Sequence, residues 1–213
     1  MNVIKKIGTL FLILGLSGCI TISLFPRIEP LQETVLEGSG EKKILLLDIS
    51  GVISEESGDG MVEEPDMVAR IKETLLKAEQ DHQIKAVILR INSPGGTVTA
   101  SDMIYHEIIQ FKERTGIKVI ASISGIGASG AYYIAMAADQ IIANPTAITG
   151  SIGVIMLHMN VNGLLEKIGV GAEAIKSGAH KDMGSPFKEL SVEDRKIFQG
   201  MIDGMQEQFL EIV

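Results

Sequence analysis

With 213 residues, 46% of them hydrophobic, the chain is long and apolar enough for one sizeable folded domain, which excludes a disordered protein. Its net charge of −8 argues against nucleic acid as the main partner, because phosphate binding needs a basic face. Neither GxGxxG nor GxxxxGK(S/T) occurs, so nucleotide binding has no support, and we expect neither a cofactor nor a metal.

The first 25 residues predict a membrane-targeting segment. Lys5 and Lys6 precede an apolar run over 7–18, which ends in LSGC; this string is typical of a bacterial lipoprotein signal, in which Cys19 receives lipid after cleavage. The run also continues past Cys19, and at ~1.5 Å per residue it is just long enough for an uncleaved anchor across ~30 Å of hydrocarbon. Both alternatives tether the chain to the cell membrane at its extracytoplasmic face, since few basic residues follow the run. As the only cysteine of the chain, Cys19 has no partner for an internal disulfide.

Residues 26–43 contain prolines, glycines and charges without periodicity, which is typical of a linker, so the folded domain is expected over 44–213. The expected strands are Lys42–Ile53, Ile84–Ile91 and Ile117–Ile123, with weaker candidates at QIIAN (140–144), SIGVIM (151–156) and Val170–Ser177. The expected helices are Pro65–Gln80, Ala100–Arg114, Ser129–Ala138 and one from Ser191 that still runs at Val213. This alternation predicts an α/β fold with a parallel sheet, and the unfinished last helix predicts a C-terminally truncated domain.

Two glycine-rich segments follow expected strands, at Asn92–Thr97 and Ser124–Ala128. Because ligand sites of open parallel sheets gather at the carboxyl ends of the strands, we expect these two loops to lie beside each other. In the first loop, Gly95 and Gly96 allow either a plain tight turn or a set of backbone N–H groups that face an empty site as an oxyanion hole.

Ser129 stands where the third strand gives way to a helix. A serine on such a turn, between Ala128 and Gly130, has the physical features of a nucleophile elbow without the GxSxG spelling, because unpaired N–H groups and the helix dipole favour negative charge there. The alternative is that Ser129 is an ordinary helix N-cap.

A nucleophilic serine needs a general base. The four histidines are His82, His106, His158 and His180. His158 and His180 leave a Ser-His-Asp triad open, although no acid is placed to orient either of them. Lys181, among small and apolar residues, allows a Ser–Lys pair, which requires a neutral amine; alternatively it is a loop lysine paired with Asp182.

Four motifs resemble those of the signal peptide peptidase A family, which are Ser–Lys peptidases of the Clp/crotonase fold. The motifs are RINSPGGTV, SGIGASGAYYIAMAAD, NPTAITGSIGVI and SGAHKDMGSPF, and they occur in the family's order and spacing. The resemblance covers roughly Ile44 to Phe187 and implies a Clp/crotonase-like fold of repeated β-β-α units around a parallel sheet.

The resemblance also implies roles for individual residues. By position, Ser129 matches the nucleophile and Lys181 the general base. Gly96 and Gly130 match the backbone donors of the oxyanion hole, and Ser151 matches a serine that orients the lysine. His180 is then a neighbour of the base, while Tyr132 and Tyr133 are expected in the core or in a pocket wall.

By the same resemblance, the chain is expected to be a membrane-tethered serine endopeptidase that degrades hydrophobic remnants of signal peptides through an acyl-enzyme. Single-domain relatives form homo-oligomeric rings in which serine and lysine come from adjacent protomers. The alternatives are a stomatin-type membrane-bound protease of the same fold, a crotonase-type acyl-CoA enzyme and an inactive membrane-tethered scaffold. Two features depart from the family pattern: the LSGC string and the early end of the domain.

Overall fold

The structure is a computed structural model that describes residues 31–56 and 66–213. The targeting segment over 1–25, Cys19 and the first part of the expected linker lie outside these residues. Within the described part of the chain, no helix is both long enough and apolar enough to cross a membrane.

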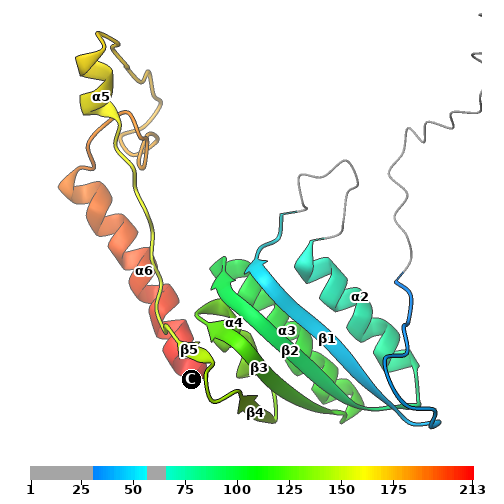
Figure 1. Cartoon of the computed structure of the whole chain (residues 1–213). Coiled ribbons are helices and arrows are strands. Elements are labelled where there is room, and N and C mark those ends of the chain that lie inside the picture. Colours follow the sequence, from blue (N-terminus) through cyan, green and yellow to red (C-terminus); the bar gives the residue numbers. More distant parts are fainter. Residues whose placement is uncertain (1–30, 57–65) are drawn as a thin grey trace, which may run out of the picture.

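Five parallel strands form one sheet, as the alternating pattern predicted (Figure 1). The strands are β1 (Lys43–Ile53), β2 (Ile84–Gly96), β3 (Lys118–Ala128), β4 (Gln140–Ala143) and β5 (Ile148–Gly150). Their order is β1-β2-β3-β4, and β5 pairs with the last part of β3, beyond the end of β4. Helices α2 (Met67–Gln80), α3 (Val98–Thr115) and α4 (Gly130–Ala135) cover one face of this sheet. The predicted α/β fold is therefore confirmed.

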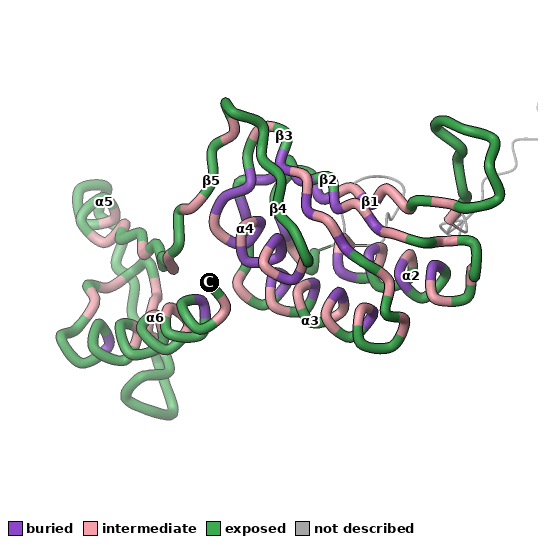
Figure 2. Tube along the Cα trace, turned by 90° about the horizontal axis from the view of Figure 1, so that it is seen from below, coloured by how far each residue is buried: buried purple, intermediate pink, exposed green. Residues whose placement is uncertain are grey.

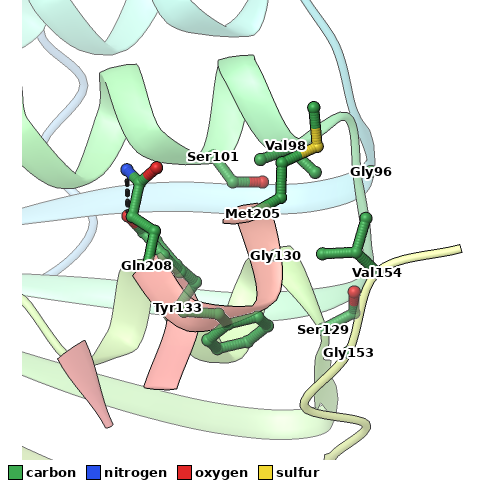
Figure 3. Close-up of a pocket in the computed structure, with 11 residues that line it drawn as sticks. Gly96, Val98, Ser101, Ser129, Gly130, Tyr133, Gly153, Val154, Met205 and Gln208 are labelled. Atoms are coloured by element: carbon green, nitrogen blue, oxygen red, sulfur yellow. Dashed lines mark hydrogen bonds between the residues drawn. The ribbon is translucent and has the colours of Figure 1, made fainter. Parts of the chain in front are cut away.

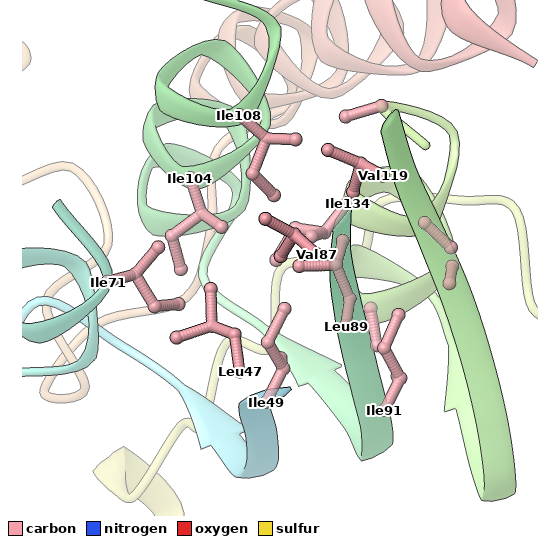
Figure 4. Packing of buried hydrophobic residues seen from close by; sticks show 14 of the residues in the cluster. Leu47, Ile49, Ile71, Val87, Leu89, Ile91, Ile104, Ile108, Val119 and Ile134 are labelled. Atoms are coloured by element: carbon pink, nitrogen blue, oxygen red, sulfur yellow. The ribbon is translucent and has the colours of Figure 1, made fainter. Parts of the chain in front are cut away.

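The core lies between that face and the helices (Figure 4). Alternate residues of the three long strands point toward the helices, because successive side chains of a strand face opposite sides of the sheet. The central members of this cluster are Leu47, Ile49, Val87, Leu89, Ile91, Val119 and Ile123 from the strands, and Ile71, Ile104, Ile108, Phe111 and Ile134 from the helices. Each such side chain contributes about 1.5–3 kcal/mol when fully buried, so this layer holds the sheet rigidly.

Two strands are longer than predicted. Asn92–Thr97 and Ser124–Ala128 were expected as loops, but β2 continues to Gly96 and β3 to Ala128. Pairing with a neighbour extends them, since Gly96 lies opposite Ile53 and Ser93 lies opposite Gly127. The register shifts that accompany these pairs let the glycine-rich segments stay in the sheet. The expectation that the two segments lie side by side is confirmed.

Two weak strand predictions are wrong. QIIAN forms β4, but neither 151–156 nor Val170–Ser177 is a strand. A strand needs a hydrogen-bonded neighbour, and the chain leaves the sheet after β5, so these apolar segments have no sheet edge to join. Both segments are apolar, but neither of them pairs with a strand of this chain.

Residues 151–213 form an extended region that we call the arm. An irregular segment runs out from β5 to α5 (Asn162–Lys167), a loop over 168–191 follows, and α6 (Val192–Ile212) returns to the sheet, so that the C-terminus lies near β5 (Figure 1). Ser191 caps α6 with its side-chain oxygen, which accepts a hydrogen bond from the backbone N–H of Asp194.

The arm is mostly exposed (Figure 2). Its only buried residues are Asp194 and Phe209. Large apolar side chains are nevertheless abundant there, and several are almost fully open to solvent: Ile155, Leu157, Met159, Ile175 and Val192 are 76–102% exposed. An apolar surface of this extent is typical of an interface rather than of a free surface.

Candidate active site

Ser129 lies at a sharp turn between β3 and α4. Its φ is 52° and its ψ is −125°, a conformation that residues other than glycine rarely adopt. The side chain makes no capping hydrogen bond, so the ordinary N-cap alternative is wrong. Such strain persists only where the surrounding structure enforces it, and it is typical of active-site turns.

The surroundings of Ser129 enforce this turn from the side of β5. The backbone N–H of Ser129 donates to the carbonyl of Gly150 at 2.8 Å, which extends the pairing of β3 with β5 by one bond. Ser129 therefore ends the sheet, and the N–H of Gly130 is the first of α4, where a helix offers no acceptor of its own. The half-buried Ser129 side chain remains accessible.

Three glycines bring the end of β2 against this turn. A Cβ on Gly95, whose φ is +100°, would lie 2.8 Å from the nitrogen of Gly130. A Cβ on Gly96 would lie 1.8 Å from the carbonyl oxygen of Ile53, and one on Gly130 would lie 2.1 Å from Oγ of Ser101. Side chains are excluded at all three positions, so backbone atoms of Gly96 and Gly130 lie close together beside the serine.

A small pocket opens next to Ser129 (Figure 3). Its lining comes from the end of β2, the starts of α3 and α4, the beginning of the arm and the last turns of α6. The lining residues are Gly96, Val98, Ser101, Ser129, Gly130, Tyr133, Gly153, Val154, Met205, Gln208 and Phe209. The predicted nucleophile and both predicted oxyanion glycines therefore share one pocket, and so does Tyr133, whose expected place in a pocket wall is confirmed.

A polar cluster ties the end of α6 to this pocket. The Tyr133 hydroxyl donates to Oδ1 of Asp102 at 2.6 Å, and Nε2 of Gln208 donates to the same oxygen at 2.8 Å. Burial and the hydrogen bond to Asp102 raise the pKa of Tyr133 well above its usual range, so the phenol stays neutral. Phe209 packs edge-on against Tyr133, with ring centroids 5.1 Å apart. The last turns of α6 thus pack against α4, the helix that directly follows Ser129.

Ser151 follows the residue that accepts the N–H of Ser129. Its φ is 53°, and it shares with Ser129 the distinction of being a non-glycine residue with positive φ within the described residues. The two strained serines directly follow the paired ends of β3 and β5, but Ser151 is exposed and makes no hydrogen bond with Lys181 in this chain.

Lys181 lies far from Ser129 within one chain. It belongs to the loop over 168–191, at the end of the arm remote from β5 (Figure 1). The neighbouring His180 contacts Asp194 in the first turn of α6, whereas Met205 lines the Ser129 pocket. Met205 lies eleven positions after Asp194, which corresponds to roughly 16 Å along the helix at 1.5 Å per residue, far beyond hydrogen-bond reach. The structure therefore does not bring the two predicted catalytic residues together in one copy.

The Lys181 side chain is exposed and has no hydrogen bond or ion pair with any described residue. The predicted alternative, a pair with Asp182, is wrong, because Asp182 binds Lys176 and Lys188 instead, each at 2.8 Å. The burial that a neutral lysine requires is also absent from this single chain.

From the sequence, a histidine base for Ser129 stayed possible, but no acid could be assigned to orient it. The structure places acids beside His180. Nδ1 of His180 lies 2.8 Å from Asp194, but Nε2 lies 3.7 Å from Glu193, so both ring nitrogens face carboxylates and neither faces a serine. His158 bonds the carbonyl of Ser185 within the arm. Neither histidine is therefore poised as a base for Ser129 within the chain.

Comparison with known proteins relates part of this chain to a family of peptidases. Residues 111–213, which include Ser129 and Lys181, match the family model of peptidase family S49. The chain carries a peptidase family S49 domain. It is 40% identical over 175 residues to "Putative protease slr0021" of Synechocystis sp., covering 82% of this chain and 58% of that protein.

Two further relatives carry related names. The "Putative signal peptide peptidase SppA" of Enterococcus faecium is 37% identical over 85% of this chain and 53% of its own. "Protease 4" of Haemophilus influenzae is 37% identical over 80% of this chain and 27% of its own. The chain thus spans about half the length of the first relatives that it matches. A solved structure of a ClpP1 mutant from Listeria monocytogenes is 18% identical with a TM-score of 0.46, over 78% of this chain and 68% of that one.

Several residues that shape the site were not predicted from the sequence. Asp102 and Gln208 are 106 positions apart, and only the return of α6 to the sheet joins them. Met205 looked like one more apolar helix residue. Asp194 stands in the first turn of a helix, which is a common position for a solvated carboxylate, and nothing in its spacing indicates burial.

Proposed function

We propose that this chain is the catalytic part of a serine endopeptidase in which Ser129 attacks the peptide carbonyl and Lys181 of a neighbouring copy acts as general base. The observation that carries this proposal is that Ser129 and Lys181 lie at separate places within one chain. A strained serine whose side chain makes no capping bond lines a pocket with two glycine amides. The one lysine of the family motif belongs to the loop that binds the first turn of α6, about 16 Å along that helix from the pocket.

The chemistry follows from these positions. Ser129 Oγ bonds to the carbonyl carbon while its proton passes to the neutral Nζ of Lys181, and the N–H groups of Gly96 and Gly130 stabilise the oxyanion. Lys181 then gives the proton to the departing amine, which leaves an acyl-enzyme, and water activated by the same lysine releases the acid. Ser151 orients the lysine. Cleavage is expected to rise toward alkaline pH, since the amine must lose its proton before it can act.

The exposed apolar side chains of the arm support assembly into a homo-oligomeric ring. Contact between copies would bury residues such as Ile155 and Leu157, which are 81% and 85% exposed here. It would also bring Lys181 into apolar surroundings, where the neutral amine is favoured.

Hydrophobic peptides left in the membrane after signal-peptide cleavage are the proposed substrates. The pocket beside Ser129 presents Val98, Val154 and Met205, while Nε2 of Gln208 donates a hydrogen bond to the Tyr133 hydroxyl at 3.2 Å. The name of the Enterococcus faecium relative points to the same class of substrate. Residues 1–25 would tether the enzyme to the extracytoplasmic face of the membrane, either as a segment across the bilayer or through lipid on Cys19.

The test is complementation between two inactive variants. Ser129→Ala and Lys181→Ala are purified separately, mixed, and assayed for cleavage of a hydrophobic signal-peptide fragment. Random mixing in a ring leaves about a quarter of the sites with both groups, so that share of wild-type activity should return. Mixed oligomers without any return of activity, or full activity of Lys181→Ala with loss in His158→Ala or His180→Ala, would refute the shared dyad.

A further inference from the structure

The loop that carries Lys181 is held on both sides of that lysine. On one side, Nδ1 of His180 lies 2.8 Å from Oδ1 of Asp194. On the other side, Asp182 pairs with Lys176 and Lys188, each at 2.8 Å. Both sequence neighbours of Lys181 are therefore fixed by charged contacts, while no described residue binds its own side chain.

Asp194 is the common anchor of these contacts. Lys188 bridges Asp182 and Asp194, with its Nζ 3.2 Å from Oδ2 of Asp194, so that both neighbours of Lys181 are linked to one carboxylate. The Asp194 side chain is only 3% exposed, the lowest exposure of any group in this network. The hydrogen bond from His180, together with Lys188, holds the pKa of Asp194 far below its usual range, so it stays ionised.

This burial is not needed to begin α6. Ser191 already caps the helix through the N–H of Asp194, and an exposed acid in the first turn interacts with the helix dipole equally well. Removing a carboxylate from water is unfavourable unless partners compensate it. Those partners, His180 and Lys188, come from the loop and not from the helix, so what Asp194 fixes is the loop.

We infer that Asp194 is a positioning residue for Lys181: it binds His180 directly and Asp182 through Lys188, and so fixes the direction in which the lysine projects from the arm toward the neighbouring copy. The inference rests on the proposed role of Lys181 as the base. It gives His180 a function as well, as the link between the buried carboxylate and the backbone beside the lysine.

The experiment compares Asp194→Ala and Asp194→Asn with Asp203→Asn in the full-length assembled protein. Asp203 is an exposed acid of the same helix whose one side-chain partner among the described residues is Gln199, so it controls for a loss of charge on α6. With a hydrophobic signal-peptide fragment, Asp194→Ala should lower kcat by about 10- to 100-fold, because misplacement of a catalytic group by an ångström has effects of that size. KM should stay nearly constant. The asparagine keeps the volume and one acceptor, so its loss should be smaller.

Two readouts separate positioning from a merely structural role. The acid limb of the pH profile of kcat/KM should move in both Asp194 variants and not in Asp203→Asn, while the oligomer mass stays unchanged. In a Lys181→Ala background, Asp194→Asn should leave the residual acylation of Ser129 by an activated ester unchanged, since the lysine through which Asp194 acts is gone.

Unchanged kcat in both Asp194 variants would overturn the inference, and so would an equal loss in the presence and absence of Lys181. Loss of the oligomer in both variants, with an unmoved pH profile, would also overturn it. Failure of the proposed function looks different: Lys181→Ala would then itself retain full activity. Lys181→Ala inactive beside a fully active Asp194→Ala would refute only the positioning role.

Discussion

The part of the chain that ends at β5 and the arm that follows it are held in place by different interactions. In the first, the sheet and helices α2 to α4 enclose a continuous apolar core, and Ser129 is held by backbone pairing and by glycines that exclude side chains. In the arm, the only buried residues are Asp194 and Phe209, and the loop around Lys181 is held by ion pairs. The proposed nucleophile is therefore fixed by the fold of one chain, while the position of the proposed base depends on charged contacts and on what covers the arm.

The largest effect should come from removing either proposed catalytic group. Ser129→Ala and Lys181→Ala should each lower kcat for a hydrophobic peptide by at least about 10³-fold, because members of a catalytic unit act together. The melting temperature should change little in both, since Ser129 caps nothing and Lys181 binds no described residue. A large drop in thermal stability of Lys181→Ala would show that the arm uses this lysine structurally.

The next effect concerns the glycines that belong to the core side of the site. Gly130→Ala places a Cβ 2.1 Å from Oγ of Ser101, so α4 must shift and the oxyanion donor moves with it. We expect a loss of about 10²–10³ in kcat, the size typical of one lost donor. The matched control is Gly200→Ala in α6, where a Cβ would have nothing within 4 Å and helix stability should rise by at most about 1 kcal/mol. Equal kinetics of the two variants would exclude Gly130 from the site.

A third comparison separates folding from assembly. Phe111→Ala removes a fully buried core ring and should lower the free energy of unfolding by about 3–5 kcal/mol. Leu157→Ser changes an arm residue that is 85% exposed, so it should change the unfolding free energy of one copy by no more than about 0.5 kcal/mol. Its effect should appear as a smaller oligomer in sedimentation. An unchanged oligomer would mean that this part of the arm is not the interface.

The smallest expected effect is an acid transition confined to the arm. Hydrogen bonds from Lys176 and Lys188 lower the pKa of Asp182 to about 2. A depressed carboxylate pKa stabilises the folded loop above about pH 4, near the value of an unfolded aspartate, and this stabilisation is lost as the pH falls toward 2. Hydrogen exchange of the loop should therefore accelerate over that range while β2 and β3 stay protected. Asp182→Asn should exchange rapidly at every pH; if it shows the same acid transition, another group is responsible.

The sequence predicted the core well because apolar periodicity reports burial directly. Helices α2, α3 and α6 and the three long strands lie where their patterns placed them, with shifted ends. The ends of β2 and β3 were missed because glycine and proline favour turns locally, whereas pairing between Gly96 and Ile53 keeps the strand going. The segments at 151–156 and 170–177 were wrongly predicted as strands, because an apolar sequence does not indicate which surface will cover the segment.

Some residues of the candidate site could likewise be predicted from the sequence, and others could not. Ser129, Gly96 and Gly130 were predicted together because strand ends of a parallel sheet meet at one edge. Asp102, Gln208 and Asp194 could not be predicted, since their positions depend on the path by which α6 returns to the sheet and on partners distant in sequence. No local pattern of residues in the sequence indicates that α6 returns to the sheet.

The length of α6 also bears on when the proposed enzyme is active. In one copy the loop that carries Lys181 binds the first turn of α6, about 16 Å along the helix from the pocket of Ser129. By the proposed mechanism, a newly made chain therefore carries halves of two catalytic sites and no complete one. By the same mechanism such a chain would be inactive alone, and it would begin to cleave peptides only once it had assembled with other copies.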